Sequence, residues 1–217
     1  MCGGMRAVYA AISRMRLSRL CGTCALVTCG LAAQQKIPSV PKCQSFEGRT
    51  WQAALAYLKQ ERTTLEPACI YDAISILRND TWSNRYKQEI PIFLQYLDFK
   101  NPDAEIAHTV RVGPTDDFYP AADALGSFGD PVIHAIVIPA MQKVIRSEDA
   151  NKVSRLNAAS VYWWIEPHPS TIAFIARAAQ GTGDRETGDA LAGLAAQMAA
   201  GCDKAELDDC KKALHPE

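Results

Sequence analysis

The sequence predicts an all-α protein. Beyond residue 48, apolar residues recur at i, i+3, i+4 and i+7 along most of the chain, the spacing of one face of an α-helix. No convincing series of alternating polar and apolar residues occurs in this region, which argues against a β or α/β fold. The stretches between the predicted helices are mostly short and rich in Pro, Gly, Asn and Asp, as helix–helix turns are.

The composition is that of a globular protein. Of 217 residues, 48% are hydrophobic and 22% are charged, and both values are ordinary for a chain that buries a core. The length allows one large domain or two small ones. We expect residues 34–48 to form an irregular linker and residues 49–217 to form a single helical-repeat domain.

The first 33 residues have the pattern of a secretory signal peptide. No Asp or Glu precedes Glu47, and Arg14, Arg16 and Arg19 stand directly before the apolar run 20–33. A basic segment, a short apolar segment and small residues at its end are typical of such signals. The run is too short for a membrane-spanning helix, which needs about 20 residues. We therefore predict that residues 1–33 direct export and that the protein is extracytoplasmic, either periplasmic or secreted.

Two other interpretations of the leader stay open. Leu26-Val27-Thr28-Cys29 resembles a bacterial lipoprotein box, which would make Cys29 the lipidated first residue, although Thr28 departs from the usual Gly, Ala or Ser. An organellar transit peptide is the second alternative, because such peptides are also rich in Arg and poor in acids. Contact with a membrane is expected only if Cys29 is lipidated.

The charge of the body disfavours polyanionic partners. Loss of the four leader arginines leaves 19 basic and 24 acidic residues, a net charge of about −5. A mildly acidic body does not favour binding to nucleic acid or to an anionic membrane.

Four cysteines remain outside the leader: Cys43, Cys69, Cys202 and Cys210. An even number in an exported chain predicts two disulfides. In an elongated body the two ends lie far apart, which favours the local pairs 43–69 and 202–210. Eight residues of continuous helix span about 12 Å, too far for a disulfide, so Cys202 must lie outside the last helix. Free buried thiols are the alternative, and a zinc site is disfavoured because no CxxC motif occurs in the body.

Nine helices are predicted in order along the body. The first has Trp51, Ala54, Leu55 and Leu58 on one face, the second begins at Glu66-Pro67, and Ser83 caps the third, which carries its apolar stripe to Leu97. A polar, turn-rich segment follows at 100–117, with a short extended piece at 108–112. The remaining helices are expected at 119–128, 131–146, 150–165, 169–180, 185–200 and 204–214.

One segment of the body resembles a HEAT-like repeat. In residues 121–141, a small and apolar helix runs through Gly129-Asp130-Pro131 into a second helix with Ile138-Pro139. Ile90-Pro91 repeats part of this pattern, and the remaining helix pairs of residues 66–214 match it more weakly. The resemblance implies paired antiparallel helices stacked as a short right-handed α-solenoid, in which each pair buries its apolar face against the next. An irregular helical bundle is the alternative fold.

Pro91 and Pro139 stand at matching places in this pattern, and two interpretations stay open. A proline inside a helix removes one amide donor and clashes with the preceding turn, so each one would mark a tolerated kink. Alternatively, each proline would mark a helix start.

No motif in the sequence predicts catalysis, a metal or a cofactor. The segment 181–189 has the glycine spacing of a P-loop, but Asp189 stands where the phosphate-binding Lys belongs, and the segment follows a helix rather than a strand. We interpret it as a helix–helix turn. His134 lies among apolar residues, which predicts a hydrogen-bonded core histidine.

Tyr162-Trp163-Trp164 is the candidate binding site. Consecutive residues of a helix point about 100° apart, so three aromatic side chains cannot share one buried face. Trp164 falls on the more polar side, together with Asn157 and Ser160, where an exposed Trp would make a contact anchor. The alternative is that neighbouring helices cover Trp164 on both sides.

These observations predict an exported, non-catalytic scaffold that binds another protein, a conclusion that relies partly on analogy of fold. A small extracytoplasmic helical hydrolase or an enzyme inhibitor is the alternative, because a site can be built from residues distant in sequence. A pocket with converging Asp, His and Arg would favour the hydrolase. A shallow aromatic groove would favour the scaffold.

Overall fold

The computed structural model describes residues 43, 50–79, 84–102, 118–202 and 207–215. Every regular element within these ranges is helical, and they contain no strand. The predicted all-α class is therefore confirmed. The signal peptide, most of the linker, Ser83 and the segment 103–117, including the extended piece expected at 108–112, lie outside the described residues.

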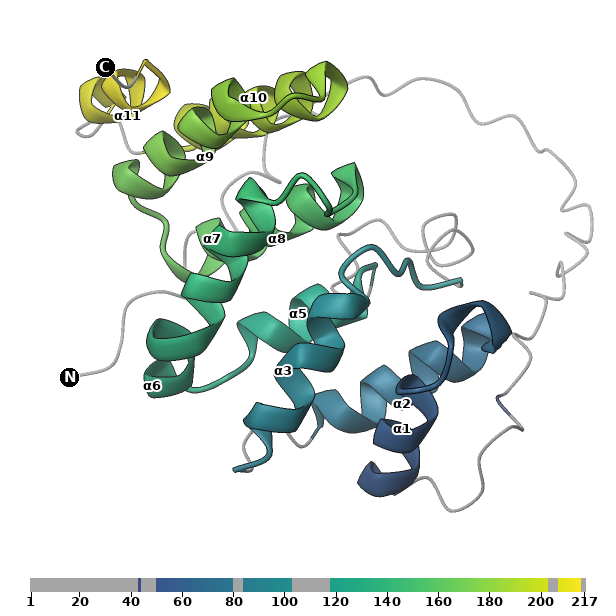
Figure 1. The fold of residues 1–217 in the computed structure, drawn as a ribbon. Helices are drawn as coiled ribbons and strands as arrows, with labels where there is room; N and C mark the ends of the chain where they lie inside the picture. Colours follow the sequence, from purple (N-terminus) through teal and green to yellow (C-terminus); the bar gives the residue numbers. More distant parts are fainter. Residues whose placement is uncertain (1–42, 44–49, 80–83, 103–117, 203–206, 216–217) are drawn as a thin grey trace, which may run out of the picture. The chain divides into compact units, whose positions relative to one another are not determined.

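The helices lie close to their predicted positions (Figure 1). The N-terminal part contains α1 (Trp51–Leu58), η1 (Arg62–Thr64), α2 (Pro67–Arg78) and α3 (Tyr86–Gln95). The C-terminal part contains α5 (Pro120–Gly126), α6 (Asp130–Val132), η2 (Ile133–Val137), α7 (Ile138–Arg146), α8 (Lys152–Ile165), α9 (Pro169–Gly181), α10 (Arg185–Ala200) and α11 (Leu207–Leu214). The helix α1 ends at Leu58, the last residue of its apolar stripe, and the 3₁₀ turn η1 follows.

Local sequence explains where several helices begin. The side chains of Thr50, Asn151 and Asp184 accept hydrogen bonds from the first free backbone N–H groups of α1, α8 and α10. Such capping oxygens satisfy donors that have no partner inside the helix. The helices α2, α5 and α9 begin with a proline, where the missing N–H costs nothing.

The two repeated prolines lie inside helical stretches. Pro91 stands within α3. Pro139 follows the π-helical turn η2, in which the N–H of Ile138 bonds to the carbonyl of Ile133, five residues back. Proline clashes with the carbonyl four residues before it, and a wider π turn relieves that crowding. Of the two interpretations, a proline inside a helix is correct for Pro91, whereas Pro139 stands in the first turn of α7, directly after the π turn.

The helices pack in chain order and form two alternating sets. We call α1, α3, α7 and α9 the first row and α2, α5, α8 and α10 the second row. In the second row α2 contacts α5, α5 contacts α8, and α8 contacts α10. In the first row α1 contacts α3, and α7 contacts α9. The most extensive contacts join α9 to α10 and α7 to α8. The helix α7 thus packs most extensively against α8, rather than against α5, with which the HEAT-like pattern of residues 121–141 pairs it.

Fully buried alanines are concentrated in the second row, whereas both rows contribute large side chains to the core: the second row also buries Ile74, Leu77, Leu125 and Leu191 completely, and α1 of the first row buries Ala54. The second row buries a completely inaccessible alanine in each helix: Ala73, Ala121, Ala124, Ala158, Ala159 and Ala195. The first-row helices α3, α7 and α9 contribute bulky side chains with no exposure: Phe93, Met141, Ile145, Ile172 and Ile175. Small residues allow helix axes to approach, and larger ones fill the space that remains between the rows.

The helix α11 packs against both α9 and α10. It buries Cys210 and Ala213, while Asp208, Asp209, Lys211 and Lys212 are exposed. Its inner face is therefore apolar and its outer face charged, as in a helix that closes one end of a helical stack.

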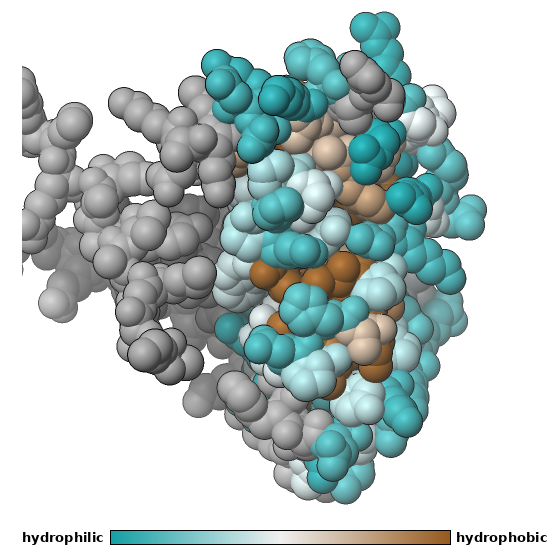
Figure 2. Space-filling view, turned by 90° about the vertical axis from the view of Figure 1, so that its left-hand side faces the viewer, coloured by the Kyte–Doolittle hydropathy of each residue, from teal (hydrophilic) through white to brown (hydrophobic). Residues whose placement is uncertain are grey.

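No single described helix has both the length and the apolar composition to cross a membrane. One pair, Pro120–Gly126 with Asp130–Arg146, passes that test jointly, and its two parts are bent by 105°. Figure 2 shows a face on which apolar side chains gather in one area among hydrophilic ones.

Candidate functional site at the end of helix α8

The last turn of α8 places its three aromatic side chains in three different environments. Tyr162 is 5% exposed, and its ring meets Phe174 of α9 edge-on at a centroid distance of 5.7 Å. Its hydroxyl accepts a hydrogen bond of 2.9 Å from the side-chain amide of Gln142. Tyr162 is thus a core residue that joins α8 to α7 and α9.

Trp164 lies on the surface. Its exposed fraction is 59%, and among the described residues it is the one large apolar side chain that is exposed. One edge of its indole ring rests against Gly126 at the end of α5: a Cβ atom at Gly126 would lie 2.6 Å from Cζ3 of Trp164. The absence of a side chain at Gly126 therefore leaves space for the ring. The ring contacts the end of α5 along one edge, and much of the rest of the side chain is exposed to solvent.

Trp163 is half-buried and packs against the hydrophobic core. The prediction that the three rings cannot share one buried face is confirmed, and the alternative in which neighbouring helices cover Trp164 is wrong. A role of Tyr162, Trp163 and Trp164 in binding stays a prediction, for which Trp164 offers most of the available surface.

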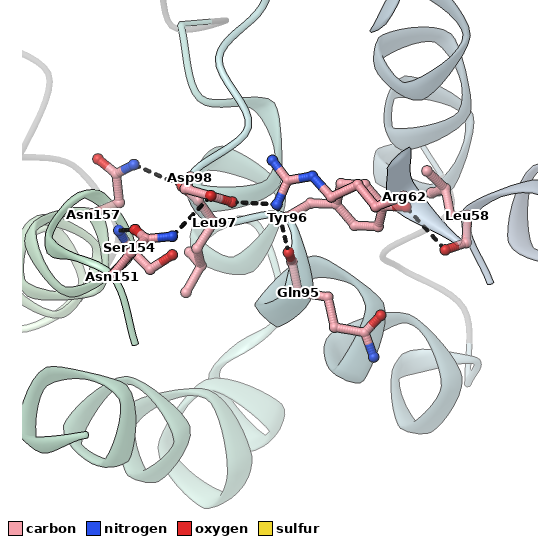
Figure 3. Close-up of polar contacts among 9 residues, drawn as sticks. All are labelled: Leu58, Arg62, Gln95, Tyr96, Leu97, Asp98, Asn151, Ser154 and Asn157. Atoms are coloured by element: carbon pink, nitrogen blue, oxygen red, sulfur yellow. Dashed lines mark hydrogen bonds and ion pairs between the residues drawn. The ribbon is translucent and has the colours of Figure 1, made fainter. Parts of the chain in front are cut away.

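The N-terminal end of α8 is held by a polar network around Asp98 (Figure 3). One carboxylate oxygen of Asp98 accepts a hydrogen bond of 2.6 Å from Arg62 of η1, and the other accepts one of 2.9 Å from the amide of Asn151. Asn151 also caps α8 through its side-chain oxygen. Asp98 thus ties the first turn of α8 to the N-terminal helices.

A second bond ties α8 to the same N-terminal segment nearly two turns further along. The side-chain amide of Asn157 donates a hydrogen bond of 2.6 Å to the carbonyl of Leu97, also drawn in Figure 3. Asn157, Ser160 and Trp164 follow one another at helical spacing on one side of α8. Ser160 and Trp164 are exposed. They form a surface on α8 that begins one turn after Asn157, the residue that bonds to Leu97.

Arg155 holds α8 from the opposite, buried side. Its side chain is 2% exposed. Its Nε donates to the carbonyl of Ile145 over 2.8 Å, and its guanidinium donates to the hydroxyl of Thr182 over 2.7 Å. The carboxylate of Glu148 lies 3.8 Å away. A buried charge is tolerated only with such partners.

The burial of Arg155 was not predicted from the sequence, although a signal was present. The residue precedes Ala158, Ala159 and Tyr162 by three, four and seven positions, so it stands on the apolar stripe of its helix. A basic residue in such a stripe indicates a buried, hydrogen-bonded guanidinium.

A second buried polar contact lies between α1 and α3. Glu89 is completely inaccessible and accepts a hydrogen bond of 2.5 Å from the indole N–H of Trp51. The guanidinium of Arg85 lies over the Trp51 ring, 4.5 Å from its centroid. The helical periodicity placed Trp51 correctly on the buried face, whereas the burial of Glu89 was not predicted.

Two groups have shifted pKa values, and both have structural explanations. Burial raises the pKa of Tyr96, an effect partly opposed by the nearby positive charge of Arg62, and its hydroxyl donates to the carbonyl of Leu58. The pKa of Asp184 is lowered, above all by the hydrogen bond from the Thr187 hydroxyl and further by backbone N–H groups at the start of α10. Neither shift points to proton transfer.

The segment 181–189 forms the turn between α9 and α10. Asp184 accepts hydrogen bonds from the backbone N–H groups of Glu186 and Thr187 and so caps α10. The helix–helix turn expected from the sequence is present. A depression of about 420 Å³ lies beside it, between α9, α10 and the end of α11, and no histidine lines it.

His134 differs from its expectation. It lies in η2 and is exposed, so the prediction of a core histidine is wrong. The π turn that precedes Pro139 changes which positions face inward, and Ile133 and Val137 take the buried places. No group of three or more His, Cys, Asp and Glu side chains within the described part of the chain is arranged to hold a metal ion.

Both expected disulfides are present. Cys43 is bonded to Cys69 in α2, with a Cα–Cα distance of 4.7 Å. Cys202 lies after the end of α10 and is bonded to Cys210 of α11 over 6.6 Å. Cys202 is therefore outside the last helix, as its spacing from Cys210 requires. Two disulfides are typical of an oxidising, extracytoplasmic compartment.

Comparison with protein-family models, with curated proteins and with solved structures found no match. A functional proposal therefore depends on the residues of this chain alone.

Proposed function

We propose that this protein is an exported scaffold that binds another protein outside the cytoplasm, with Trp164 as the anchor of the contact. The exposure of this single large apolar side chain, the one of its kind among the described residues, carries the proposal. Tryptophan is among the residues that contribute most to binding energy at protein interfaces. Its solvation at the surface is unfavourable unless a partner covers it.

The supports around Trp164 favour binding without prior rearrangement. Hydrogen bonds from Asn151 and Asn157 and from Arg155 hold α8 to the neighbouring segments. Gly126 limits the position of the ring. An anchor that is already ordered loses less conformational entropy on binding.

We further propose that the helices form a HEAT-like right-handed α-solenoid. The support is the packing order, in which each second-row helix contacts the next second-row helix. In such an architecture every helix pair contacts mainly its neighbours, and the outer faces of the rows are available to partners. Export through residues 1–33 to the periplasm or the medium is consistent with the two disulfides.

A position-specific cross-link tests the binding role of Trp164. A photoreactive side chain is placed at Ser160, which is exposed and lies one turn before Trp164, and the protein is irradiated in cells that export it. We expect one discrete cross-linked product. Truncation of an interface anchor costs about 2 kcal/mol or more, roughly a thirtyfold loss of affinity. Trp164→Ala should therefore remove most of that product, whereas Trp164→Phe should retain part of it.

The same photoreactive side chain at exposed Lys211 of α11 is the matched control. A product at both positions that is unaffected by Trp164→Ala would contradict the proposal. The melting temperatures of the variants separate binding from folding. Trp164→Ala should change the melting temperature less than Trp163→Ala does, because Trp163 is half-buried. A large drop for Trp164→Ala would make the ring a structural element.

Intact mass tests export. We expect a mature N-terminus near Gln34 and a gain of four hydrogen atoms on reduction, two for each disulfide. An uncleaved chain with free thiols would contradict export. A start at Cys29 with added acyl mass would identify a lipoprotein.

A further inference from the structure

The exposed charges of the first row have one sign. The helices α1, α3, α7 and α9 contain a single acidic residue, Glu89, and it is completely buried. The same helices expose Lys87, Lys143, Arg146 and Arg177. In a body with a net charge of about −5, the exposed charged side chains of these four helices are thus all positive.

The cations of the second row are neutralised by neighbouring acids. Arg78 lies 3.5 Å from Asp123, Lys152 pairs with Glu186, and Arg185 lies 3.7 Å from Asp189. Within the described ranges, Lys143, Arg146 and Arg177 make no ion pair with any acid. Among the described residues, these three cations of the first row are therefore not neutralised.

Part of this charge borders a depression on α7. It has a volume of about 470 Å³ and is lined by Pro139, Gln142, Lys143, Arg146 and Ser147. Its lining combines two cations, an amide and a hydroxyl, and it includes no acid. These are the groups that donate hydrogen bonds to carboxylates.

Contacts below the depression hold two of these donors in place. The guanidinium of Arg146 lies over the Phe174 ring, 4.3 Å from its centroid, which leaves the N–H groups at its edge open to a ligand. The amide of Gln142 gives one hydrogen to the Tyr162 hydroxyl and retains a second.

We propose that this basic groove, defined by Gln142, Lys143, Arg146 and Ser147, binds the carboxylates of an acidic segment of a partner protein. The groove offers two cations, Lys143 and Arg146, and two neutral hydrogen-bond donors, Gln142 and Ser147. Such a set can bind a small number of separate carboxylate groups. A nucleic acid or an anionic membrane presents many charges and would be repelled by the acidic remainder of the body. The site does not depend on the proposed role of Trp164, because that residue lies on the second row.

An octaglutamate peptide with a fluorescent label tests the groove. Its binding to the purified, disulfide-bonded protein is followed by fluorescence anisotropy at low ionic strength. Exposed ion pairs contribute up to about 1 kcal/mol each, so loss of two should weaken binding by about tenfold. We expect this result for the double variant Lys143→Gln with Arg146→Gln.

The double variant Lys211→Gln with Lys212→Gln is the matched control, because it removes the same charge from the exposed face of α11. It should change the affinity by less than about twofold. Equal losses in both double variants, or no binding by the wild type, would overturn the proposal. Tighter binding of a single-stranded oligonucleotide of equal charge, or of anionic vesicles, would overturn the choice of a protein segment.

Two further variants distinguish the groove from a general charge effect and from the surface around Trp164. Tyr162→Phe keeps the charge of the groove and removes the acceptor that holds Gln142, and it should weaken peptide binding by about twofold to threefold. Trp164→Ala should leave peptide binding unchanged. A loss with Trp164→Ala equal to that of the groove double variant would mean that one surface, rather than two, binds partners.

Discussion

The two rows of helices differ in the number of alanines that they bury and in the charges that they expose. The second row buries alanines and pairs its exposed cations with acids, and it presents one large apolar group, Trp164. The first row buries fewer alanines and, within the described part of the chain, leaves Lys143, Arg146 and Arg177 without acids. Burial thus determines which residues occupy the inner faces of both rows. The outer faces are not constrained in this way, and they can carry side chains that suit different partners.

The largest effect on stability is expected from Arg155, the residue that joins the two rows. Arg155 belongs to the second row and bonds the end of α7 and the turn after α9. Arg155→Ala should lower the free energy of unfolding by about 2–4 kcal/mol, because it leaves buried acceptors unsatisfied and opens a cavity. Urea unfolding followed by tryptophan fluorescence measures this loss.

Arg177→Ala is the control for Arg155→Ala, since it removes an exposed arginine from the neighbouring helix α9. Its effect on stability should stay within about 0.5 kcal/mol. Similar losses from both variants would show that the rows are not joined through Arg155.

A smaller effect is expected where two glycines of the second row differ in their surroundings. A Cβ atom at Gly126 would meet the Trp164 ring, whereas one at Gly193, in α10, has nothing within 4 Å. Gly193→Ala should stabilise the protein by about 0.5–1 kcal/mol, as alanine does inside helices.

Gly126→Ala should lack this gain and displace the indole of Trp164. We expect it to be about 1 kcal/mol less favourable than Gly193→Ala, with a red-shifted tryptophan emission as the ring becomes more exposed. Equal stabilisation by both variants, without a change in emission, would show that Gly126 does not support Trp164.

The smallest effect concerns the cap of α10. The pKa of Asp184 is lower in the folded protein than its ordinary value of 3.8. The stability that its charge contributes is therefore fully present above that value and is lost as the pH falls through the lower folded value. Asp184→Asn retains a good N-cap and removes this titration.

Near pH 7, wild type and Asp184→Asn should have melting temperatures within about 2 °C of each other. On acidification below about pH 4, the wild type should lose more stability than the variant. Parallel acid profiles, measured by circular dichroism, would exclude a contribution of the Asp184 charge.

Several features of the candidate site could be read from the sequence. The angular spacing of helical residues predicted that Trp164 would leave the buried face, and the structure exposes it. The eight-residue spacing of Cys202 and Cys210 predicted a helix boundary between them, and α10 ends before Cys202. Both inferences use local geometry, which a single helix obeys wherever it packs.

Other features depend on residues far apart in the chain. Gly126 supports Trp164 from 38 positions away, and Asp98 meets Asn151 across 53 positions. The exposure of His134 depends on a π turn, which no local propensity predicts. The alternation of first-row and second-row helices likewise became visible only through contacts between helices that are not adjacent in sequence.

The helical class, the approximate helix boundaries, the leader pattern and the two cysteine pairs all follow from the order of residues, because periodicity, capping and spacing act over a few positions. Three other properties required the packed helices: which cations are neutralised, which aromatic ring is supported at the surface, and where Arg155 and Glu89 find their partners. They depend on which helices meet, and helix contacts are selected by the summed burial of many side chains rather than by any local pattern.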